Sequence, residues 1–114
     1  MSGIILKPTD VVLLPFPFTD LTSTKKRPIL VVKGPDRLGD LIALPITSQN
    51  HHPMSIAISN TDLVKGKFPK ESSVKIDKIF TFNQKIIIGR IAEVTPEFFS
   101  KILDQVCHYL DCCK

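Results

Sequence analysis

The sequence lacks tryptophan, has few glycines and contains no long apolar run. Among its 114 residues there are 5 glycines and 3 cysteines. A membrane-spanning helix needs about 18 consecutive apolar residues or more, and no stretch approaches that length. The apolar segment at residues 4–6 stops at Lys7 and Pro8, too early for the apolar region of a signal peptide. We therefore expect neither a membrane span nor a secretory leader.

Cysteine is scarce and unevenly placed. Cys107, Cys112 and Cys113 all fall within the last eight positions of the chain. An odd number of cysteines at one end cannot form a disulfide framework across a domain. A reducing compartment is therefore expected, and we predict a cytoplasmic protein.

Charge of both signs is present in moderate amounts. The chain has 15 Lys and Arg residues against 11 Asp and Glu residues, which gives a formal net charge of +4. This basic bias suits an anionic partner, but it is also common in proteins that have none. A hydrophobic content of 43% is typical of a folded globular chain. We predict one domain that covers residues 1–114.

Short runs rich in Val and Ile alternate with turn residues over most of the chain, a pattern typical of β-structure. The segment at residues 33–40 has the Gly, Pro and Asp of a tight hairpin. Pro15 and Pro17 lack amide donors, so we expect the first strand to end there or to lie at an edge. We read the three isoleucines at 86–88 as part of a buried strand. The predicted strands are residues 10–16, 28–33, 40–47, 54–59, 73–76 and 86–94.

The apolar period changes near the C-terminus, which indicates a helix. Thr95 is a suitable N-cap, Pro96 fits the first helical position and Glu97 complements the helix dipole. We predict a helix over about 95–113, docked on a sheet. Its expected apolar stripe consists of Phe99, Ile102, Leu103, Val106 and Leu110. The predicted fold is mainly β with a C-terminal helix (α+β), a small barrel closed by that helix.

Three consecutive cations, Lys25, Lys26 and Arg27, precede Pro28 and an apolar strand. By itself such a triplet is typical of a solvated hairpin loop. Pro28 fixes its own φ and favours an extended conformation at Arg27. Arg27 would then project from a rigid strand entry, and a planar, permanently charged fork suits a phosphate.

Polar side chains also follow the strand predicted at 40–47. Thr47, Ser48, Gln49 and Asn50 are consecutive hydrogen-bonding residues. Alone, they are typical of a strand end whose side chains satisfy a turn. If the strands at 28–33 and 40–47 form a hairpin, however, antiparallel pairing brings Arg27 and Thr47 to the same open end.

Other polar groups are weaker candidates. His51 and His52 are adjacent, and neighbouring residues of an extended segment point in opposite directions. His108 and Cys112 are one helical turn apart, but two ligands are too few for a structural metal site. We therefore expect no metal and no cofactor. The segment at 60–75 carries Lys65, Lys67, Lys70 and Lys75, and it is either a solvated loop or the extension of a positive groove.

Five segments together resemble the MazF/PemK (Kid) family, the toxins of bacterial type II toxin–antitoxin pairs. They are TDVVLLPFPFTD, KKRPILVV, LPITSQ, SSVKIDKIFTF and GRIAEVTPEFF, and they cover nearly the whole chain. The resemblance implies a homodimeric SH3-like barrel of the CcdB/MazF/PemK type. It also implies metal-independent cleavage of single-stranded RNA, and silencing by a cognate antitoxin whose C-terminal segment covers the RNA groove.

The same resemblance suggests roles for individual residues. Arg27 matches the family's catalytic arginine, Thr47 its catalytic threonine and Asp77 a carboxylate proposed as base in some members. Ser48 and Thr81 match positions that contact RNA. We add Lys25, Lys26, Gln49 and Lys75 as expected RNA contacts.

The chain departs from the family pattern at three places. Thr9 stands before Asp10 where the family usually has glycine, and Lys75 replaces an arginine used by some members. Phe80 replaces another arginine. An aromatic ring there can stack on a base, or it can belong to the core.

The expected reaction is attack of the RNA 2′-OH on the adjacent phosphate, which leaves a 2′,3′-cyclic phosphate and a 5′-hydroxyl. An arginine has a pKa above about 12 and is a poor base at neutral pH. We therefore expect Arg27 to stabilise charge, Thr47 to donate a hydrogen bond and Asp77 to act as base. Two alternatives stay open: a non-catalytic CcdB-like toxin that binds DNA gyrase, and a nucleic-acid-binding barrel without activity.

Overall fold

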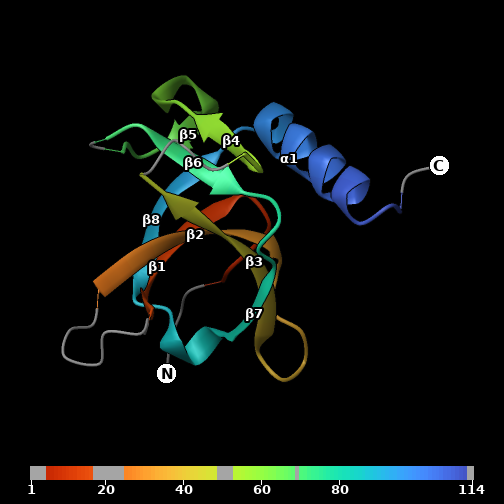
Figure 1. Cartoon of the computed structure of the whole chain (residues 1–114). Helices are drawn as coiled ribbons and strands as arrows, with labels where there is room; N and C mark the ends of the chain where they lie inside the picture. Colours follow the sequence, from red (N-terminus) through yellow and green to blue (C-terminus); the bar gives the residue numbers. More distant parts are fainter. Residues whose placement is uncertain (1–4, 17–24, 49–52, 69, 113–114) are drawn as a thin grey trace.

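The computed structural model describes residues 5–16, 25–48, 53–68 and 70–112 (Figure 1). Within these ranges one α-helix, α1 (Pro96–Tyr109), follows a body of β-strands, with two short 3-10 helices, η1 (Asn60–Asp62) and η2 (Gln84–Ile86). The strands are β1 (Asp10–Phe16), β2 (Lys25–Lys33), β3 (Asp40–Thr47), β4 (Ser55–Ile58), β5 (Leu63–Lys65), β6 (Ser72–Lys75), β7 (Phe80–Asn83) and β8 (Gly89–Val94). The predicted fold class, mainly β with a C-terminal helix, is confirmed.

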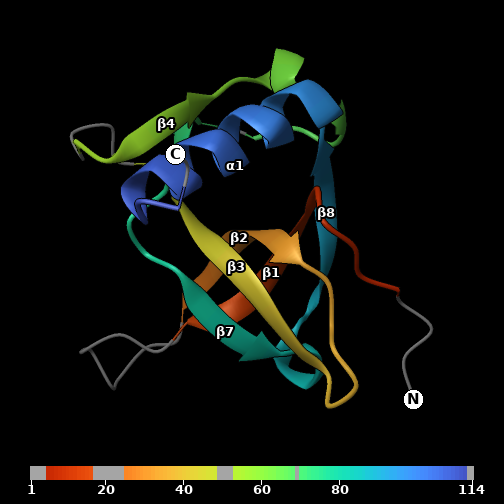
Figure 2. The same ribbon diagram turned by 90° about the vertical axis from the view of Figure 1, so that its right-hand side faces the viewer.

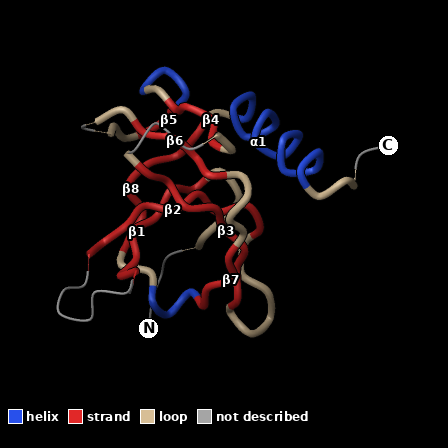
Figure 3. Tube along the Cα trace, in the orientation of Figure 1, coloured by secondary structure: helices blue, strands red, loops and turns tan. Residues whose placement is uncertain are grey.

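All the strand pairs are antiparallel, in the order β4-β6-β3-β2-β1-β8-β5, and β7 also pairs with β3. The sheet curls so that β1, β2, β3, β7 and β8 surround one region while α1 lies beyond it (Figure 2). The tube in Figure 3 shows the same division between the strands and α1. β1 is not at an edge, but its pairing with β8 stops at Leu13, before Pro15.

The predicted hairpin between β2 and β3 is confirmed. The side chain of Asp36 accepts hydrogen bonds from the amides of Leu38 and Asp40, at 2.9 and 3.0 Å. Gly39 has a φ of 88°, a conformation that other residues adopt only with strain. This local chemistry sets the register of the two strands.

The prediction for residues 86–94 was partly wrong. β8 begins only at Gly89, and Ile86 belongs to η2. The side chain of Asn83 accepts from the amide of Lys85 and starts that turn. Ile86 and Ile88 are 42% and 49% exposed. β-branched residues favour a strand locally, but the chain must turn here to connect β7 with β8. Neither β5 nor β7 was predicted.

The alternation of side chains along the strands builds two separate cores. The barrel core contains Leu6, Val12, Leu14, Ile29, Val31, Leu41 and Ala43. The helix-side core lies on the other face of the same strands and includes Val11, Leu30, Leu44, Ile46 and Val74, with Phe98, Ile102 and Val106 of α1. Because a strand exposes successive residues to opposite faces, one strand contributes to both cores.

The start of α1 was predicted correctly, its end was not, and its buried face was predicted in part: Ile102 and Val106 are buried and Phe99 packs against the core, as expected. Thr95 Oγ1 accepts from the amide of Phe98 at 3.2 Å. The helix ends at Tyr109 because Asp111 adopts a φ of 59° and the amide of Cys112 donates to the carbonyl of Cys107 at 3.0 Å. The buried residues are Phe98, Ile102 and Val106, whereas Leu103 and Leu110 are exposed. No helix in the described part of the chain is long and apolar enough to cross a membrane.

A group of four charged residues, the Asp10 cluster, joins the start of β1 to β8. It consists of Lys7, Asp10, Arg90 and Glu93. The fully buried carboxylate of Asp10 accepts from the amide and the Nζ of Lys7, both at 3.0 Å, and from Nη1 of Arg90 at 3.1 Å. Lys7 Nζ also lies 3.1 Å from Glu93 Oε2. The hydrogen bond with Asp10 raises the pKa of Lys7 above its usual value.

Candidate functional site

Arg27 lies inside β2, because this strand begins at Lys25 and not at Pro28 as predicted. It pairs with Leu14 of β1, and alternation places it on the same face of β2 as Ile29 and Val31, the face of the barrel core. The side chain is half-buried and its Nε is withdrawn from solvent. The guanidinium is therefore held by a paired strand at one end of the barrel.

Thr47 is the last residue of β3 and lies at the same end. The β2–β3 pairing runs to Ile29 and Pro45, and Arg27 and Thr47 each lie two residues beyond this pair, at the same end of the hairpin. On its other side Thr47 pairs with Ser73 of β6. Thr47 thus stands between the strand of Arg27 and a buried serine. The hairpin argument from the sequence is confirmed in its geometry.

Asp77 lies in the segment that joins β6 to β7. Ile46 of β3 pairs with Val74, and Ala43 pairs with Phe80. Between these two pairs β3 advances three residues, whereas the segment from β6 to β7 advances six. The extra residues, Asp77 among them, therefore bulge beside β3. The amide of the preceding residue, Ile76, donates to the carbonyl of Met54 at 3.0 Å. Asp77 is half-buried, with Oδ1 withdrawn from solvent.

Lys75 lies on the same face of the sheet as Arg27, Thr47 and Ser73. It lies two residues beyond Ser73 on β6, pairs with Ser55 of β4 and is half-buried. Ser48 follows Thr47 directly and is exposed. We define the site face as the face of β2, β3 and β6 that carries Arg27, Thr47, Ser73 and Lys75. It combines two cations with two hydroxyls.

Two of the predicted RNA contacts lie elsewhere. Lys26 is exposed but is adjacent to Arg27 in β2, so it projects from the opposite face. Thr81 is also exposed, and it alternates with Phe80 and Phe82 along β7. Phe82 packs against the barrel core, so Phe80 lies on the side of the site face while Thr81 faces away. The ring centroids of Phe80 and Phe82 are 5.7 Å apart.

Asn50 is one of the residues named in the sequence analysis that the structure does not describe. Gln49, His51 and His52 also lie outside the described residues. Lys25 begins β2 and pairs with Phe16, but its side chain is outside the description. Arg27, Thr47 and Lys75 are thus the predicted residues that the structure gathers on one face, with Ser48 and Asp77 beside it.

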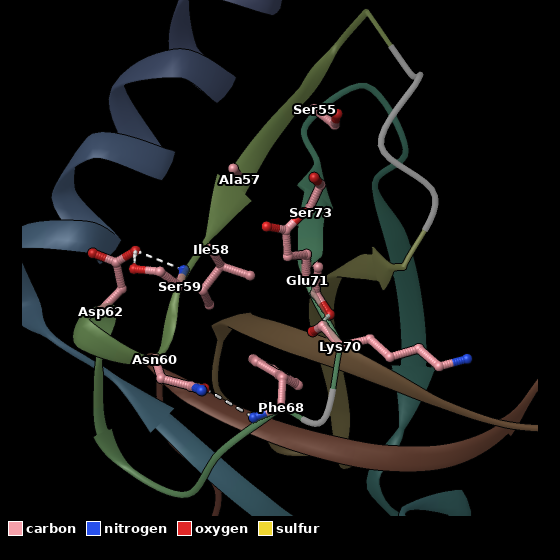
Figure 4. Close-up of a pocket in the computed structure, with 11 residues that line it drawn as sticks. Ser55, Ala57, Ile58, Ser59, Asn60, Asp62, Phe68, Lys70, Glu71 and Ser73 are labelled. Atoms are coloured by element: carbon pink, nitrogen blue, oxygen red, sulfur yellow. Dashed lines mark hydrogen bonds between the residues drawn. The ribbon is translucent and has the colours of Figure 1, made fainter.

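A pocket of about 740 Å³ adjoins the site face (Figure 4). Ser55 and Ala57 of β4 and Ser73 of β6 form one side of it, and it continues along η1 and the segment before β6. The pocket and the site face share Ser73, the partner of Thr47. The sequence reasoning missed the pocket, although Ser59 and Asp62 have the S-x-x-D spacing that starts a helical turn.

Internal hydrogen bonds fix the pocket walls. Asp62 Oδ2 accepts from the amide and the hydroxyl of Ser59, at 2.9 and 3.2 Å. Asn60 Oδ1 accepts from the amide of Phe68 at 3.0 Å, which holds the half-buried ring of Phe68 beside the pocket. Lys70 and Glu71 are exposed lining residues. Figure 4 shows all of these side chains together.

No group of three or more His, Cys, Asp or Glu side chains able to hold a metal occurs within residues 5–16, 25–48, 53–68 and 70–112. His108 Nδ1 lies 2.8 Å from the carbonyl oxygen of Asp104 in the same helix. The polar chemistry available at the site face is therefore that of a guanidinium, an ammonium, hydroxyls and the nearby carboxylate of Asp77. Such a set can bind a phosphate and move a proton.

The sequence matches the family described as PemK-like, MazF-like toxin of type II toxin-antitoxin system over residues 7–110. The structure resembles a chain of MazE–MazF from Deinococcus radiodurans, with a TM-score of 0.78, 17% identity and coverage of 97% of this chain and 100% of that chain. An endoribonuclease in complex with its cognate antitoxin, from a mycobacterial species, has a TM-score of 0.72 and 20% identity, with 94% of each chain covered.

A third similar structure is toxin MazF-mt6 of Mycobacterium tuberculosis, with a TM-score of 0.66 and 13% identity over 90% of this chain and 96% of that chain. At these identities the structural likeness concerns the fold. No curated protein sequence matches the chain.

Proposed function

Because the chain belongs to the PemK-like, MazF-like family of toxins of type II toxin–antitoxin systems, we propose that it is a metal-independent endoribonuclease that cleaves single-stranded RNA. The observation that supports this proposal is that Arg27 and Thr47 lie at the same end of the β2–β3 hairpin, with Asp77 in the bulge beside β3. One structure of similar fold is an endoribonuclease, which supports the same activity here.

RNA carries its own nucleophile, so the protein need only orient and activate it. The 2′-oxygen attacks phosphorus, the bond from phosphorus to the 5′-oxygen breaks, and the products are a 2′,3′-cyclic phosphate and a 5′-hydroxyl. One proton leaves the 2′-OH and one reaches the departing 5′-oxygen. Alignment of the attacking and leaving oxygens and stabilisation of the anionic transition state supply most of the acceleration.

Arg27 suits the charge that develops on the phosphorane oxygens. Its guanidinium stays protonated at neutral pH, offers a planar fork of donors and is anchored in a paired strand. Thr47 can donate its hydroxyl hydrogen to a phosphate oxygen held by Arg27. Lys75 adds positive charge on the same face and helps to hold the RNA backbone.

Asp77 is the proposed general base that removes the 2′-OH proton. It lies in the bulge beside β3, and the hydrogen bond of Ile76 to Met54 holds the backbone next to it. Asp77→Asn keeps the shape of the side chain but cannot accept the proton, so cleavage should fall about 100-fold or more. Full activity of this variant would refute the assignment, leaving the roles of Arg27 and Thr47 standing.

The biological role that follows is inhibition of translation and growth through destruction of messenger RNA in the cytoplasm, by a homodimer. Related structures contain a toxin with its antitoxin. We propose that a cognate antitoxin silences this chain by covering the site face with an extended segment. Co-expression with that antitoxin should restore growth, and light scattering of the purified toxin should give the mass of a dimer.

The decisive experiment incubates the purified protein with a long single-stranded RNA in excess EDTA. Mass spectrometry of the fragments identifies the cut sites and the end groups. We expect discrete cuts with cyclic-phosphate ends, lost in Arg27→Ala and kept in Arg37→Ala, which removes an exposed arginine from the β2–β3 turn. Intact RNA in the presence of folded wild-type protein would refute the proposal, and DNA gyrase would be the next target to test.

A further inference from the structure

The C-terminal end of α1 has a cap with a defined pattern of hydrogen bonds. The amide of Cys112 donates to the carbonyl of Cys107 at 3.0 Å, and inside this bond the amide of Asp111 donates to the carbonyl of His108 at 3.1 Å. Asp111 has the left-handed φ of 59°. Together these features form a Schellman motif, in which the side chains at the two ends of the outer bond frequently contact each other. In this chain both of those residues are cysteines.

The geometry of the cap meets the distance condition for a disulfide. Two cysteines can be bridged when their Cα atoms lie no more than about 7 Å apart. The backbone bond of 3.0 Å between Cys112 and Cys107 keeps their Cα atoms within that limit. The Sγ of Cys112 also donates to the carbonyl oxygen of Cys107 at 3.4 Å, so this sulfur lies over the last turn of the helix.

The two thiols differ in their access to solvent. Cys112 is exposed and Cys107 is half-buried, and both are present as thiols. An accessible thiol with a second thiol beside it is the usual arrangement of a redox-sensitive pair, because the second thiol captures the first oxidation product. In a reducing compartment such a pair stays reduced until an oxidant reaches it.

We propose that Cys107 and Cys112 are a redox modification site, which a peroxide converts to a disulfide that fixes the end of α1. The proposal goes beyond the proposed function and does not depend on it. α1 packs on the helix-side core, whereas Arg27 lies on the face of the barrel core.

The reaction takes place in two balanced steps. The sulfur of Cys112 attacks one oxygen of hydrogen peroxide, the O–O bond breaks, and the other oxygen leaves as water with the thiol proton, which gives a sulfenic acid. The sulfur of Cys107 then attacks the sulfenic sulfur, the S–S bond forms, and the hydroxyl group leaves as a second water with the second thiol proton. The two thiols lose two electrons, and the peroxide accepts them.

The first test is the mass of one peptide after peroxide treatment of the full chain. Iodoacetamide then blocks the remaining thiols, and trypsin cuts after Lys101 to release residues 102–114. We expect this peptide to lose two hydrogens and to carry one alkyl group, on Cys113. Dithiothreitol should reverse the change. Oxygen adducts on a single cysteine, or a disulfide between two chains, in place of the internal bond would refute the proposal.

Single serine variants identify the two sulfurs. Cys107→Ser and Cys112→Ser should each abolish the internal disulfide, and the matched control Cys113→Ser should keep it. An internal disulfide that persists in Cys107→Ser would join the sequence neighbours Cys112 and Cys113, and it would refute the assignment.

A second pair of variants links the reaction to the cap. Asp111→Val places a β-branched residue at a left-handed φ, whereas Asp111→Asn removes the same charge and tolerates this conformation. The valine variant should form the disulfide roughly 5-fold more slowly than the asparagine variant, because the strain opens the cap. Equal rates would show that the cap does not bring the thiols together.

Thermal unfolding tests whether the bond fits the native cap. Closing residues 107–112 into a loop restricts the unfolded chain, so oxidation should raise the Tm of the wild type by roughly 3–8 °C. The Tm of Cys107→Ser should not change on the same treatment. An unchanged or lower Tm of the oxidised wild type would mean that the disulfide distorts the cap, and it would overturn the proposal.

Discussion

The paired strands β1 and β2 carry polar groups at both ends, and the two ends differ in how deeply those groups are buried. At the start of β1, Asp10 is fully buried between Lys7 and Arg90, with three hydrogen bonds of 3.0 to 3.1 Å. At the opposite end, Arg27 is only half-buried, and its neighbours across the sheet are Leu14 and, by continuation of the register, Thr47.

Charged residues therefore serve stability at one end of these strands and are proposed to serve activity at the other. In the Asp10 cluster each charge meets an opposite charge of the same chain, which joins the N-terminal segment to β8. The site face collects cations and hydroxyls next to a pocket, an arrangement that suits an anion supplied from outside. Substitutions at the first end should therefore change stability, and those at the second should change activity.

The largest expected effect is on activity. Arg27→Ala should lower RNA cleavage about 100- to 1000-fold, because it removes the donors that stabilise the transition state. Its free energy of unfolding should change by less than about 1 kcal/mol, since a half-exposed side chain is involved. Urea unfolding and single-turnover cleavage measured on the same sample provide the check. A variant that is strongly destabilised but whose folded fraction cleaves RNA at the wild-type rate would contradict a role of Arg27 in activity.

Asp10→Ala should show the opposite pattern. It leaves two cations without their buried carboxylate, so the free energy of unfolding should fall by about 2–4 kcal/mol. The folded fraction should retain the cleavage rate of the wild type. Asp104→Ala, at an exposed position of α1, is the control and should change stability by less than about 0.5 kcal/mol. Equal effects of the two substitutions would contradict a structural role for the Asp10 cluster.

A smaller effect is expected at Thr9, which holds a φ of 85° directly before Asp10. A β-branched residue is strained in this region, whereas glycine is not. Thr9→Gly should therefore stabilise the protein by about 1 kcal/mol. Thr61→Gly, within η1, should instead destabilise it. Thermal unfolding of both variants tests the prediction, and a destabilised Thr9→Gly would show that the threonine side chain contributes more than the strain removes.

The smallest effect concerns pH. The hydrogen bond with Asp10 raises the pKa of Lys7 above its ordinary value of 10.5. A raised pKa means that the folded state favours the charged lysine, so this contribution is complete below pH 10.5 and is lost as the pH rises through the folded-state pKa. Because Lys7 is about half exposed, the loss should not exceed about 1 kcal/mol. Chemical unfolding at pH 8 and pH 11 should show a larger decrease for the wild type than for Lys7→Met.

Several features of this protein could be predicted from local sequence signals. The bounds of β1 and β3, the turn between β2 and β3, and the start of α1 at Thr95 and Pro96 all agree with the prediction. The position of Arg27 and Thr47 at the same end of the β2–β3 hairpin could also be predicted from the sequence. The two residues lie at similar distances along the chain from the turn that joins these antiparallel strands.

Other features depended on contacts between distant segments. η2 replaced a strand at Ile86 because the chain has to turn between β7 and β8. α1 buried Phe98 and exposed Leu103 because the position of the sheet selects one row of the helix. Local propensity cannot decide either outcome, since each residue fits both environments.

The amino-acid sequence by itself determined the strand-rich fold, its terminal helix and the position of Arg27 and Thr47 at the same end of one hairpin, because turn chemistry and periodicity act over a few residues. Only the tertiary structure decided that Phe80 and not Thr81 lies on the side of the site face, and that Glu71 lines a pocket beside Ser73. The reason is the register of β3 with β6 and β7, which is set by the bulge that carries Asp77 and not by any local pattern.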